Sequence, residues 1–322
     1  MFDGVTKHYG SATLKHMTLS ITVATPRLLI AASDRRLTEP IKCGIYTERS
    51  TKLTVLEHPT GVAFITYNGI GLIKDKTPSD WLWELGSRVK LAHLSLHNVL
   101  DAIRKEAERQ IVFIPISGNR RHSFIIGARE NGIASIYVVS NYERADTNGA
   151  ASKAFSHFTV SCSRLKPGSE VIVFAAGRTE YLDENSFRKI AKVAQRRGAA
   201  GVDVKNLIVK AIVAASDKGG RKAGIGASVS WAVSDVLKKG HDFGLDVPDG
   251  TTILELPNLI QRGAQYGDIV VAVGPSASKM WEKSNAEKWN KWRRPKLETS
   301  CPNCGAPVPL GYLMCGVCRH HM

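Results

Sequence analysis

The chain has 322 residues, of which 43% are hydrophobic and 23% charged, and its formal net charge is +15 at pH 7. It contains no run that approaches the ~18 continuous apolar residues of a membrane-spanning helix, and its N-terminus lacks the charged-then-apolar layout of a signal peptide. We therefore expect a soluble cytoplasmic protein with one substantial core and a small appendage, and no membrane partner.

Two β-hairpins are predicted near the start of the chain. The first runs from Thr18 along an alternating apolar segment, turns at residues 25–27 and returns to Asp34. The second begins near Lys52, turns at residues 58–61 and continues into another apolar run. Taken singly, each of these three polar residues is an ordinary strand-end residue.

After the hairpins, apolar residues recur with helical or strand periodicity. The predicted elements are helices at 78–85 and 95–107, strands at 123–128, 133–140 and 170–176, helices at 187–193 and 204–215, and a strand at 225–233. Asn131-Gly132 suits a tight hairpin turn, and Gly219-Gly220 is expected to end the last helix. This order predicts an α+β fold of two stacked antiparallel sheets with helices on both outer faces, although other α/β folds remain open.

The sequences around Thr18, Asp34 and Lys52 resemble the catalytic residues of proteasome-type N-terminal nucleophile (Ntn) hydrolases, and of proteasome β-subunits in particular. In that family the nucleophilic threonine begins the first strand, and an acidic residue follows sixteen positions later at the end of the second. The interval between residues 18 and 34 is likewise sixteen. The resemblance implies a four-layer αββα sandwich, which we assign to residues 18–275.

The resemblance also implies a mechanism. A threonine hydroxyl is a poor nucleophile until a base removes its proton, and an N-terminal threonine carries that base as its own α-amine, which titrates at about 7.7–8.0. A lysine beside the hydroxyl favours the deprotonated form, and an acidic residue keeps the lysine charged and oriented. Thr18, Lys52 and Asp34 fit these three roles, and Gly69 is the candidate for the glycine whose amide holds the oxyanion.

The chain departs from the family pattern at two places. Family members have a serine just after the central strand and an Asp-x-x-Ser-Gly pattern before the late strand. At these places the chain has Thr179 and Asp217, and neither segment is a clean match. These two residues are candidate substitutes, although a plain loop residue is the simpler interpretation of each.

Residues 1–17 form an N-terminal extension or propeptide in front of Thr18. An amine within a peptide bond has no basicity, so the mechanism needs Thr18 at the mature N-terminus. Met17-Thr18 is typical of a translation start, because initiator methionine is normally trimmed before a small residue. We expect the mature chain to begin at Thr18; the alternative is a retained extension, as in non-catalytic proteasome α-subunits.

Four of the six cysteines are close together near the end of the chain, as Cys301-Pro-Asn-Cys304 and Cys315-Gly-Val-Cys318. Two such pairs can hold one structural Zn²⁺ with four thiolates, which predicts a zinc ribbon over residues 300–322. Because four cysteines fill the coordination sphere, this metal would not be catalytic. A redox pair or disulfides are the alternatives, and Cys43 and Cys162 are expected to be reduced and inert.

A basic linker with several tryptophans, including Trp281, Trp289 and Trp292, occupies residues 276–299. Interleaved tryptophans and cations suit base stacking and phosphate contact, so nucleic acid is a possible partner. An amphipathic connector is favoured, because basic proteins commonly carry solvated lysines without such a role.

The function that we expect is that of a proteasome-like threonine-type endopeptidase with polypeptide substrates. The resemblance implies a homo-oligomeric ring, and the zinc ribbon is a candidate site for an ATPase or another recruiting partner. Two alternatives remain: a catalytically inactive proteasome-fold scaffold, and a zinc-ribbon nucleic-acid-binding protein that uses its core only for assembly.

Overall fold

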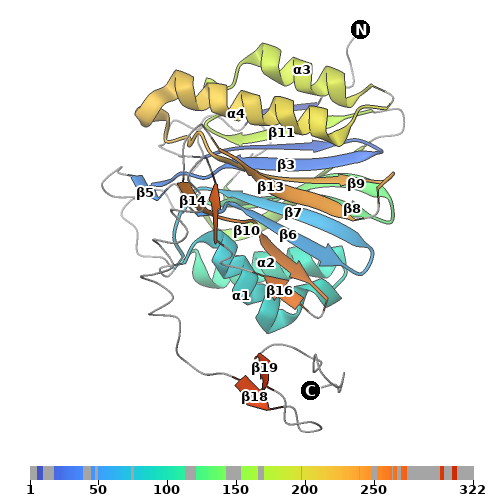
Figure 1. Cartoon of the computed structure of the whole chain (residues 1–322), viewed down its shortest axis with the longest axis vertical. Helices are drawn as coiled ribbons and strands as arrows, with labels where there is room; N and C mark the ends of the chain where they lie inside the picture. The colour runs from blue at the N-terminus through green and yellow to red at the C-terminus, as the bar shows by residue number, and fades with distance from the viewer. Residues whose placement is uncertain are drawn as a thin grey trace. The chain divides into compact units, whose positions relative to one another are not determined.

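The structure is a computed structural model. It describes residues 6–9, 18–38, 45–47, 50–73, 76–112, 121–142, 154–165, 170–196, 198–238, 240–247, 252–262, 264–266, 270–273, 298–300 and 307–309. The chain divides into two compact units, one of residues 1–249 and 253–271 and the other of residues 250–252 and 272–322. The first unit holds two large sheets and the four α-helices of the described chain (Figure 1).

Each large sheet is mostly antiparallel. The first sheet has, in spatial order, β1 (Thr6–Tyr9), β11 (Ile172–Gly177), β2 (Leu19–Ala24), β3 (Leu28–Asp34), β12 (Val229–Asp235) and β13 (His241–Asp246). The second has β10 (Ala154–Arg164), β9 (Ile133–Tyr142), β8 (Ser123–Glu130), β7 (Gly61–Asn68), β6 (Leu53–His58), β15 (Asn258–Gln261) and β16 (Ala264–Tyr266). Only the β1–β11 and β6–β15 pairs are parallel among these neighbours within the described strands.

The remaining strands form short pairs. They are β4 (Leu37–Thr38) with β5 (Ile45–Thr47), β14 (Thr252–Glu255) with β17 (Val270–Val273), and β18 (Glu298–Ser300) with β19 (Pro307–Pro309). The last pair belongs to the second unit.

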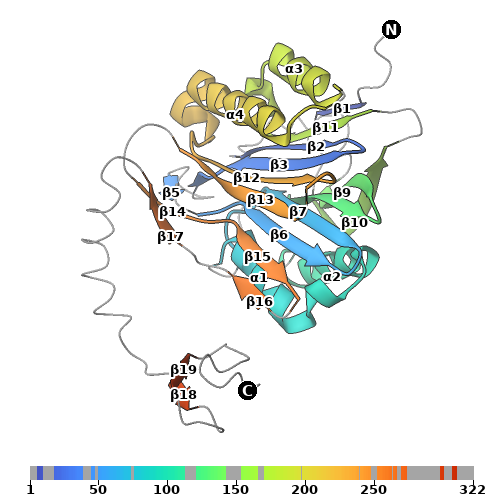
Figure 2. The same cartoon turned by 45° about the vertical axis from the view of Figure 1, so that its right-hand side comes forward.

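Helices cover the outer face of each sheet, and the inner faces pack against one another (Figure 2). Helices α3 (Glu184–Ala194) and α4 (Gly201–Ala223) pack on the first sheet, and α1 (Pro78–Val89) and α2 (Leu96–Gln110) pack on the second. Between the sheets lie side chains such as Val55, Phe64 and Phe174, each at most 2% exposed. The predicted α+β class is confirmed.

Local sequence explains where several elements begin and turn. The side chains of Thr77, Ser95 and Asp183 each accept a hydrogen bond from a backbone amide three residues later, and so cap α1, α2 and α3. At the β8–β9 turn, Asn131 and Gly132 have φ of 49° and 83°. This left-handed conformation is the one that an Asn-Gly hairpin turn requires, as the sequence predicted.

Two predicted boundaries differ from the structure. Helix α4 continues through Gly219 and Gly220 to Ala223, although a glycine costs about 1 kcal/mol relative to alanine inside a helix. The buried face of α4, which includes Ile208 and Ile212, packs on the first sheet and outweighs that cost. The last predicted strand begins at Val229 instead of residue 225.

Some strands carry no clear signal in the sequence. Strand β10 is an edge strand whose residues are mostly exposed, so it lacks the apolar alternation of a half-buried strand. Strand β1 lies within the N-terminal extension and pairs with β11 over residues 172–175. Within the described ranges, no helix has both the length and the apolar character needed to span a membrane.

Candidate active site

Thr18, Asp34 and Lys52 approach one another from two different sheets. Thr18 directly precedes β2 and Asp34 ends β3, so both lie at the open end of the first hairpin, where Ser20 is opposite Ser33. Lys52 directly precedes β6 in the second sheet. The site therefore forms only when the two sheets are packed together.

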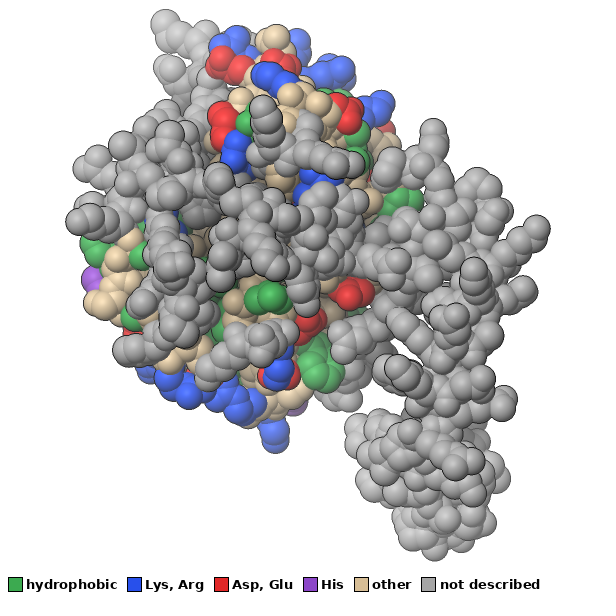
Figure 3. Space-filling view, turned by 90° about the vertical axis from the view of Figure 1, so that its left-hand side faces the viewer, with side chains coloured by type: hydrophobic (Ala, Val, Ile, Leu, Met, Phe, Trp, Pro, Cys, Tyr) green, Lys and Arg blue, Asp and Glu red, His purple; other side chains and the backbone are tan. Residues whose placement is uncertain are grey.

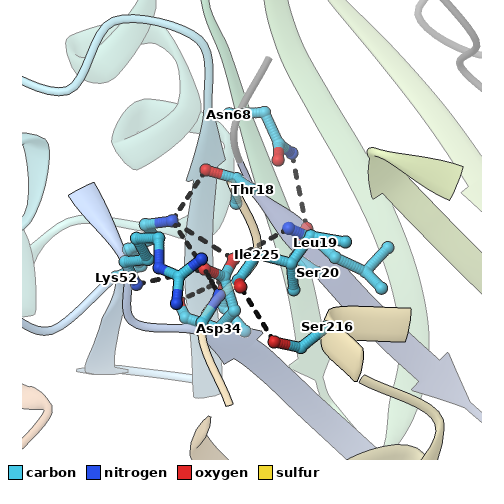
Figure 4. Close-up of polar contacts among 11 residues, drawn as sticks. Thr18, Leu19, Ser20, Asp34, Lys52, Asn68, Ser216 and Ile225 are labelled. Carbon is cyan, nitrogen blue, oxygen red and sulfur yellow. Dashed lines mark hydrogen bonds and ion pairs between the residues drawn. The ribbon is translucent and has the colours of Figure 1, made fainter. Parts of the chain in front are cut away.

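The three side chains make one hydrogen-bonded cluster (Figure 4). Lys52 Nζ lies 2.8 Å from Thr18 Oγ1 and 3.2 Å from each carboxylate oxygen of Asp34. Thr18 is 5% exposed, and Asp34 and Lys52 are fully buried. The ammonium can thus donate to the threonine hydroxyl oxygen and to the carboxylate at once.

Backbone amides hold the Asp34 carboxylate in place. Oδ1 accepts a hydrogen bond from the Leu19 amide at 2.8 Å, and Oδ2 accepts from the amides of Arg36 at 3.1 Å and Gly226 at 2.9 Å. Three amide donors and an ammonium satisfy a buried carboxylate that would otherwise be costly to desolvate. Asp34 therefore has a fixed orientation toward Lys52.

Burial and nearby cations act on the Lys52 ammonium. Removal from water lowers the pKa of Lys52 below its ordinary value, and the Asp34 carboxylate opposes this shift. The positive charges of Arg36 and Arg35 also lower it. Lys52 is therefore held as a cation mainly by Asp34.

Arg35 is a buried residue whose place beside the cluster was not predicted from the sequence. Its side chain is fully buried and donates from Nη1 to Ser230 Oγ at 2.5 Å. Burial lowers the pKa of Arg35 to about 10, and the negative charges of Glu255 and Asp34 oppose this shift. Nothing in the local sequence signals this environment, because Ser230 lies on β12 and Glu255 on β14.

Gly69, the predicted oxyanion residue, lies outside the hydrogen bonds that join Thr18, Asp34 and Lys52. It follows the end of β7 with φ of 110°, and a Cβ atom there would lie 2.2 Å from the Arg121 carbonyl oxygen. Its conformation therefore requires glycine, but the described contacts do not bring its amide to the cluster.

A second glycine is in direct contact with Thr18. Gly177 has φ of 96°, and a Cβ atom there would lie 1.8 Å from the Thr18 carbonyl oxygen. The same oxygen accepts a hydrogen bond from the Arg178 amide at 2.8 Å. The end of β11 thus fixes the backbone of Thr18. The only sign of this contact in the sequence is the Ala-Ala-Gly segment after an apolar strand.

The two candidate substitutes have different positions. Thr179 is buried and begins η2 (Thr179–Tyr181), directly after the segment that contacts Thr18. Asp217 is exposed on α4 and lies outside the cluster. Its neighbour Ser216 donates instead to the carbonyl oxygen of Ile225 at 2.9 Å, next to the Gly226 amide that binds Asp34 (Figure 4).

The predicted zinc site falls outside the described residues, since Cys301, Cys304, Cys315 and Cys318 are not among them. Within the described ranges, no group of three or more His, Cys, Asp or Glu side chains is placed to hold a metal ion. Cys162 has a free thiol and is exposed on β10. Structural zinc stays a prediction.

A pocket of about 490 Å³ lies away from Thr18, lined by residues that include Lys205, Trp231, Asp235 and Phe243. Asp235 is at the end of β12 opposite to Val229, the residue that pairs with Asp34. Figure 3 shows a different face of the molecule, the one on the left-hand side of Figure 1, where Lys and Arg side chains lie beside Asp and Glu side chains. Val202, which lines the pocket, is an exposed apolar side chain, and so is Leu237, two residues after the end of β12. The pocket is therefore separate from the cluster.

Comparisons with known proteins give matches among solved structures. No family model and no curated protein matches the chain. Among solved structures, it is similar to an Anbu (Gly-1) mutant from Hyphomicrobium sp. strain MC1, with 11% identity, a TM-score of 0.41 and coverage of 88% of this chain and 100% of that one. It is also similar to Anbu (ancestral beta-subunit) from Yersinia bercovieri, with 12% identity, a TM-score of 0.44 and coverage of 87% and 100%.

These comparisons correct the family assignment. The sequence predicted a proteasome β-subunit-like chain with a zinc ribbon, whereas the two solved structures described above are Anbu proteins and no family model supports either part of that assignment. That assignment is wrong. Identities of 11% and 12% with these TM-scores do not place the chain in a family.

Proposed function

We propose that this protein is a threonine-type endopeptidase that cleaves polypeptides through Thr18 as an N-terminal nucleophile. The observation that carries the proposal is the 2.8 Å contact between Lys52 Nζ and Thr18 Oγ1, with the same nitrogen 3.2 Å from both oxygens of Asp34. A cation this close to a hydroxyl favours its deprotonation, and the buried carboxylate keeps the cation charged.

The proposed reaction has two steps. In the first, Thr18 Oγ1 attacks the carbonyl carbon of a peptide bond, its proton passes to the free α-amine of Thr18, and the amine returns that proton to the departing amino group. This leaves the acyl part of the substrate as an ester on Thr18. In the second, water attacks the ester under the same base and regenerates the hydroxyl.

The architecture supports this proposal. Helices pack on the outer faces of two sheets whose inner faces pack together. We propose that this is a four-layer αββα sandwich of the Ntn-hydrolase type and that it corresponds to the domain assigned to residues 18–275. The nucleophile stands at the start of β2 and the acid at the end of β3, so one hairpin positions both. A homo-oligomeric ring, recruiting partners and nucleic-acid binding remain predictions.

The proposal requires cleavage or absence of the Met17-Thr18 peptide bond, since an acylated nitrogen cannot act as the base. We therefore propose that the active form begins at Thr18. In that form, the hydroxyl and its base belong to the same residue, and the hydrogen bond from Arg178 to the Thr18 carbonyl holds both in place.

The test compares two forms of the protein. A chain translated from Met17, whose initiator methionine is removed, is expected to form a covalent adduct with an electrophile directed at N-terminal threonine and to hydrolyse unfolded polypeptides. The chain that keeps residues 1–17 should do neither. Thr18→Ser should retain activity and Thr18→Ala should lose it while keeping the same thermal stability. Absence of both adduct and hydrolysis in the chain that begins at Thr18 contradicts the proposal.

A second candidate function is an inactive scaffold that keeps its N-terminal extension. One observation favours it: β1, which lies within the extension, pairs with β11 in register from Thr6 opposite Ile172 to Tyr9 opposite Ala175. An extension that forms part of the first sheet contributes to its stability. Intact-mass measurement on the natural protein separates the two functions, because a chain that retains residues 1–17 cannot use the proposed mechanism.

A further inference from the structure

A buried carboxamide beside Thr18 has an oxygen with no donor. Asn68 is the last residue of β7 and is 3% exposed. Its Nδ2 donates to Ser20 Oγ at 3.3 Å. Its Oδ1 is buried, and no hydrogen-bond donor in the described part of the chain reaches it. A buried acceptor without a donor is unusual, and it calls for a partner that is absent from this state of the protein.

The position of this oxygen relates it to the backbone of Thr18. A Cβ atom on Gly177 would lie 1.8 Å from the Thr18 carbonyl oxygen and 2.9 Å from Asn68 Oδ1, so both oxygens lie against the same side of Gly177. Figure 4 shows the Asn68 side chain over Thr18, with its nitrogen directed to Ser20 and its oxygen on the side of Thr18.

We propose that Asn68 is a positioning residue whose Oδ1 accepts a hydrogen bond from the α-amine of Thr18 once that amine is free. The proposal rests on the proposed function and names a further residue in the same site. It also bears on a departure noted in the sequence: Asp217, one of the two candidate substitutes, is exposed and lies outside the cluster, which leaves its role near the amine open to another polar group.

The difference between a peptide nitrogen and an amine explains why the oxygen has no donor now. The nitrogen of a Met17-Thr18 peptide bond carries one hydrogen in a fixed plane. A free amine rotates about its bond to Cα and carries two hydrogens, or three when protonated. One hydrogen can then be given to Asn68 Oδ1, which directs the lone pair of the neutral amine toward Thr18 Oγ1 as a base requires.

The experiment uses the chain that begins at Thr18 and measures two quantities against pH. The first is the pKa of the Thr18 α-amine, followed by NMR of a protein labelled with ¹⁵N-threonine. The second is the rate of adduct formation with an electrophile directed at N-terminal threonine. Asn68→Leu removes the acceptor, and Asn68→Asp replaces it with a charged acceptor of the same shape. Asn258→Leu, in the second sheet at β15, is the matched control for loss of a buried asparagine.

We expect Asn68→Leu to lower the pKa of the amine, because a hydrogen bond that favours the ammonium is lost, and to reduce the rate about tenfold at high pH, where the amine is neutral. Asn68→Asp should raise the pKa of the amine by about one unit or more and retain most of the rate. Asn258→Leu should leave both quantities unchanged. A merely structural role of Asn68 would lower stability without moving the pKa of the amine.

An unchanged pKa of the amine in both Asn68 variants overturns the proposal. If Asn68→Leu does not fold, Asn68→Asp alone decides, since its carboxylate has to raise that pKa if it contacts the amine. The NMR measurement needs no enzymatic activity. A shift of the pKa without adduct formation in the parent protein would therefore sustain the contact and contradict the proposed function.

Discussion

The backbone amide of Gly226 donates a 2.9 Å hydrogen bond to Oδ2 of Asp34, although 192 residues separate them in the chain. This bond ties the loop before β12 to the end of β3, so that loop is part of the candidate site. The loop is itself fixed from the other side, since Ser216 of α4 donates to the carbonyl oxygen of Ile225. The carboxylate orientation thus depends on the packing of α4.

Asp34→Asn is expected to destabilise the protein by about 3–5 kcal/mol, because it leaves the buried Lys52 ammonium without its counter-charge. The NH₂ group of the new asparagine would also face backbone N–H groups that now donate to the Asp34 carboxylate, and those donors would lose their acceptor. Urea denaturation at pH 7 measures the effect. Adding Lys52→Met to Asp34→Asn should recover part of the loss, and equal stability of the single and double variants would contradict this account.

Lys52→Met is expected to reduce the reactivity of Thr18 in the chain that begins at Thr18 by about 100-fold or more, because the hydroxyl loses the cation 2.8 Å away. The measurement is the rate of adduct formation at a fixed pH. Lys189→Met, at an exposed position on α3, is the matched control and should react at the parent rate. Parent-like reactivity of Lys52→Met would remove Lys52 from the site.

Gly177→Ala is expected to displace the Thr18 backbone, since the added Cβ would lie 1.8 Å from the Thr18 carbonyl oxygen. Gly132→Ala provides the control, because Gly132 also has a positive φ but has open space where a Cβ would lie. Both variants should lose about 1–3 kcal/mol from backbone strain. Only Gly177→Ala should lose more than this and also abolish adduct formation; similar behaviour of the two variants would show that the contact does not matter.

Stability is expected to fall as the pH drops below 6.5. Burial lowers the pKa of His58 and of His241 below 6.5, so in this range the unfolded chain binds more protons than the folded one. The free energy of unfolding should therefore rise with pH up to about 6.5 and then level off. Urea denaturation between pH 5 and 8 measures this slope. His58→Gln should reduce this slope, leaving the contribution of His241, whereas the same change at exposed His97 should not alter it.

Much of the site follows from local sequence. Apolar alternation predicts both hairpins, and the hairpins place Thr18 and Asp34 at one end of the first sheet. The approach of Lys52 from the second sheet could be expected only from the family resemblance. Its contacts with the other two residues depend on sheet packing, which the spacing of residues along the chain does not determine.

The remaining contacts could not be predicted because they join distant segments. Gly226 is one glycine among 28, and only its approach to Asp34 distinguishes it. Arg35 follows Asp34 directly, but its burial depends on Ser230 of β12. The end of helix α4 is another example. Local helix propensity predicts that the helix ends at two glycines, but packing on the first sheet stabilises it beyond them.

Because the cluster is divided between two sheets, its geometry depends on the relative position of the two sheets. Thr18 and Asp34 move with the first sheet and Lys52 with the second, and the apolar side chains between the sheets, such as Phe64 and Phe174, help to keep them in register. A slip of an ångström or two at that interface would break the 2.8 Å contact while leaving every strand intact. Partial denaturation should accordingly abolish the nucleophilic reactivity of Thr18 before secondary structure is lost.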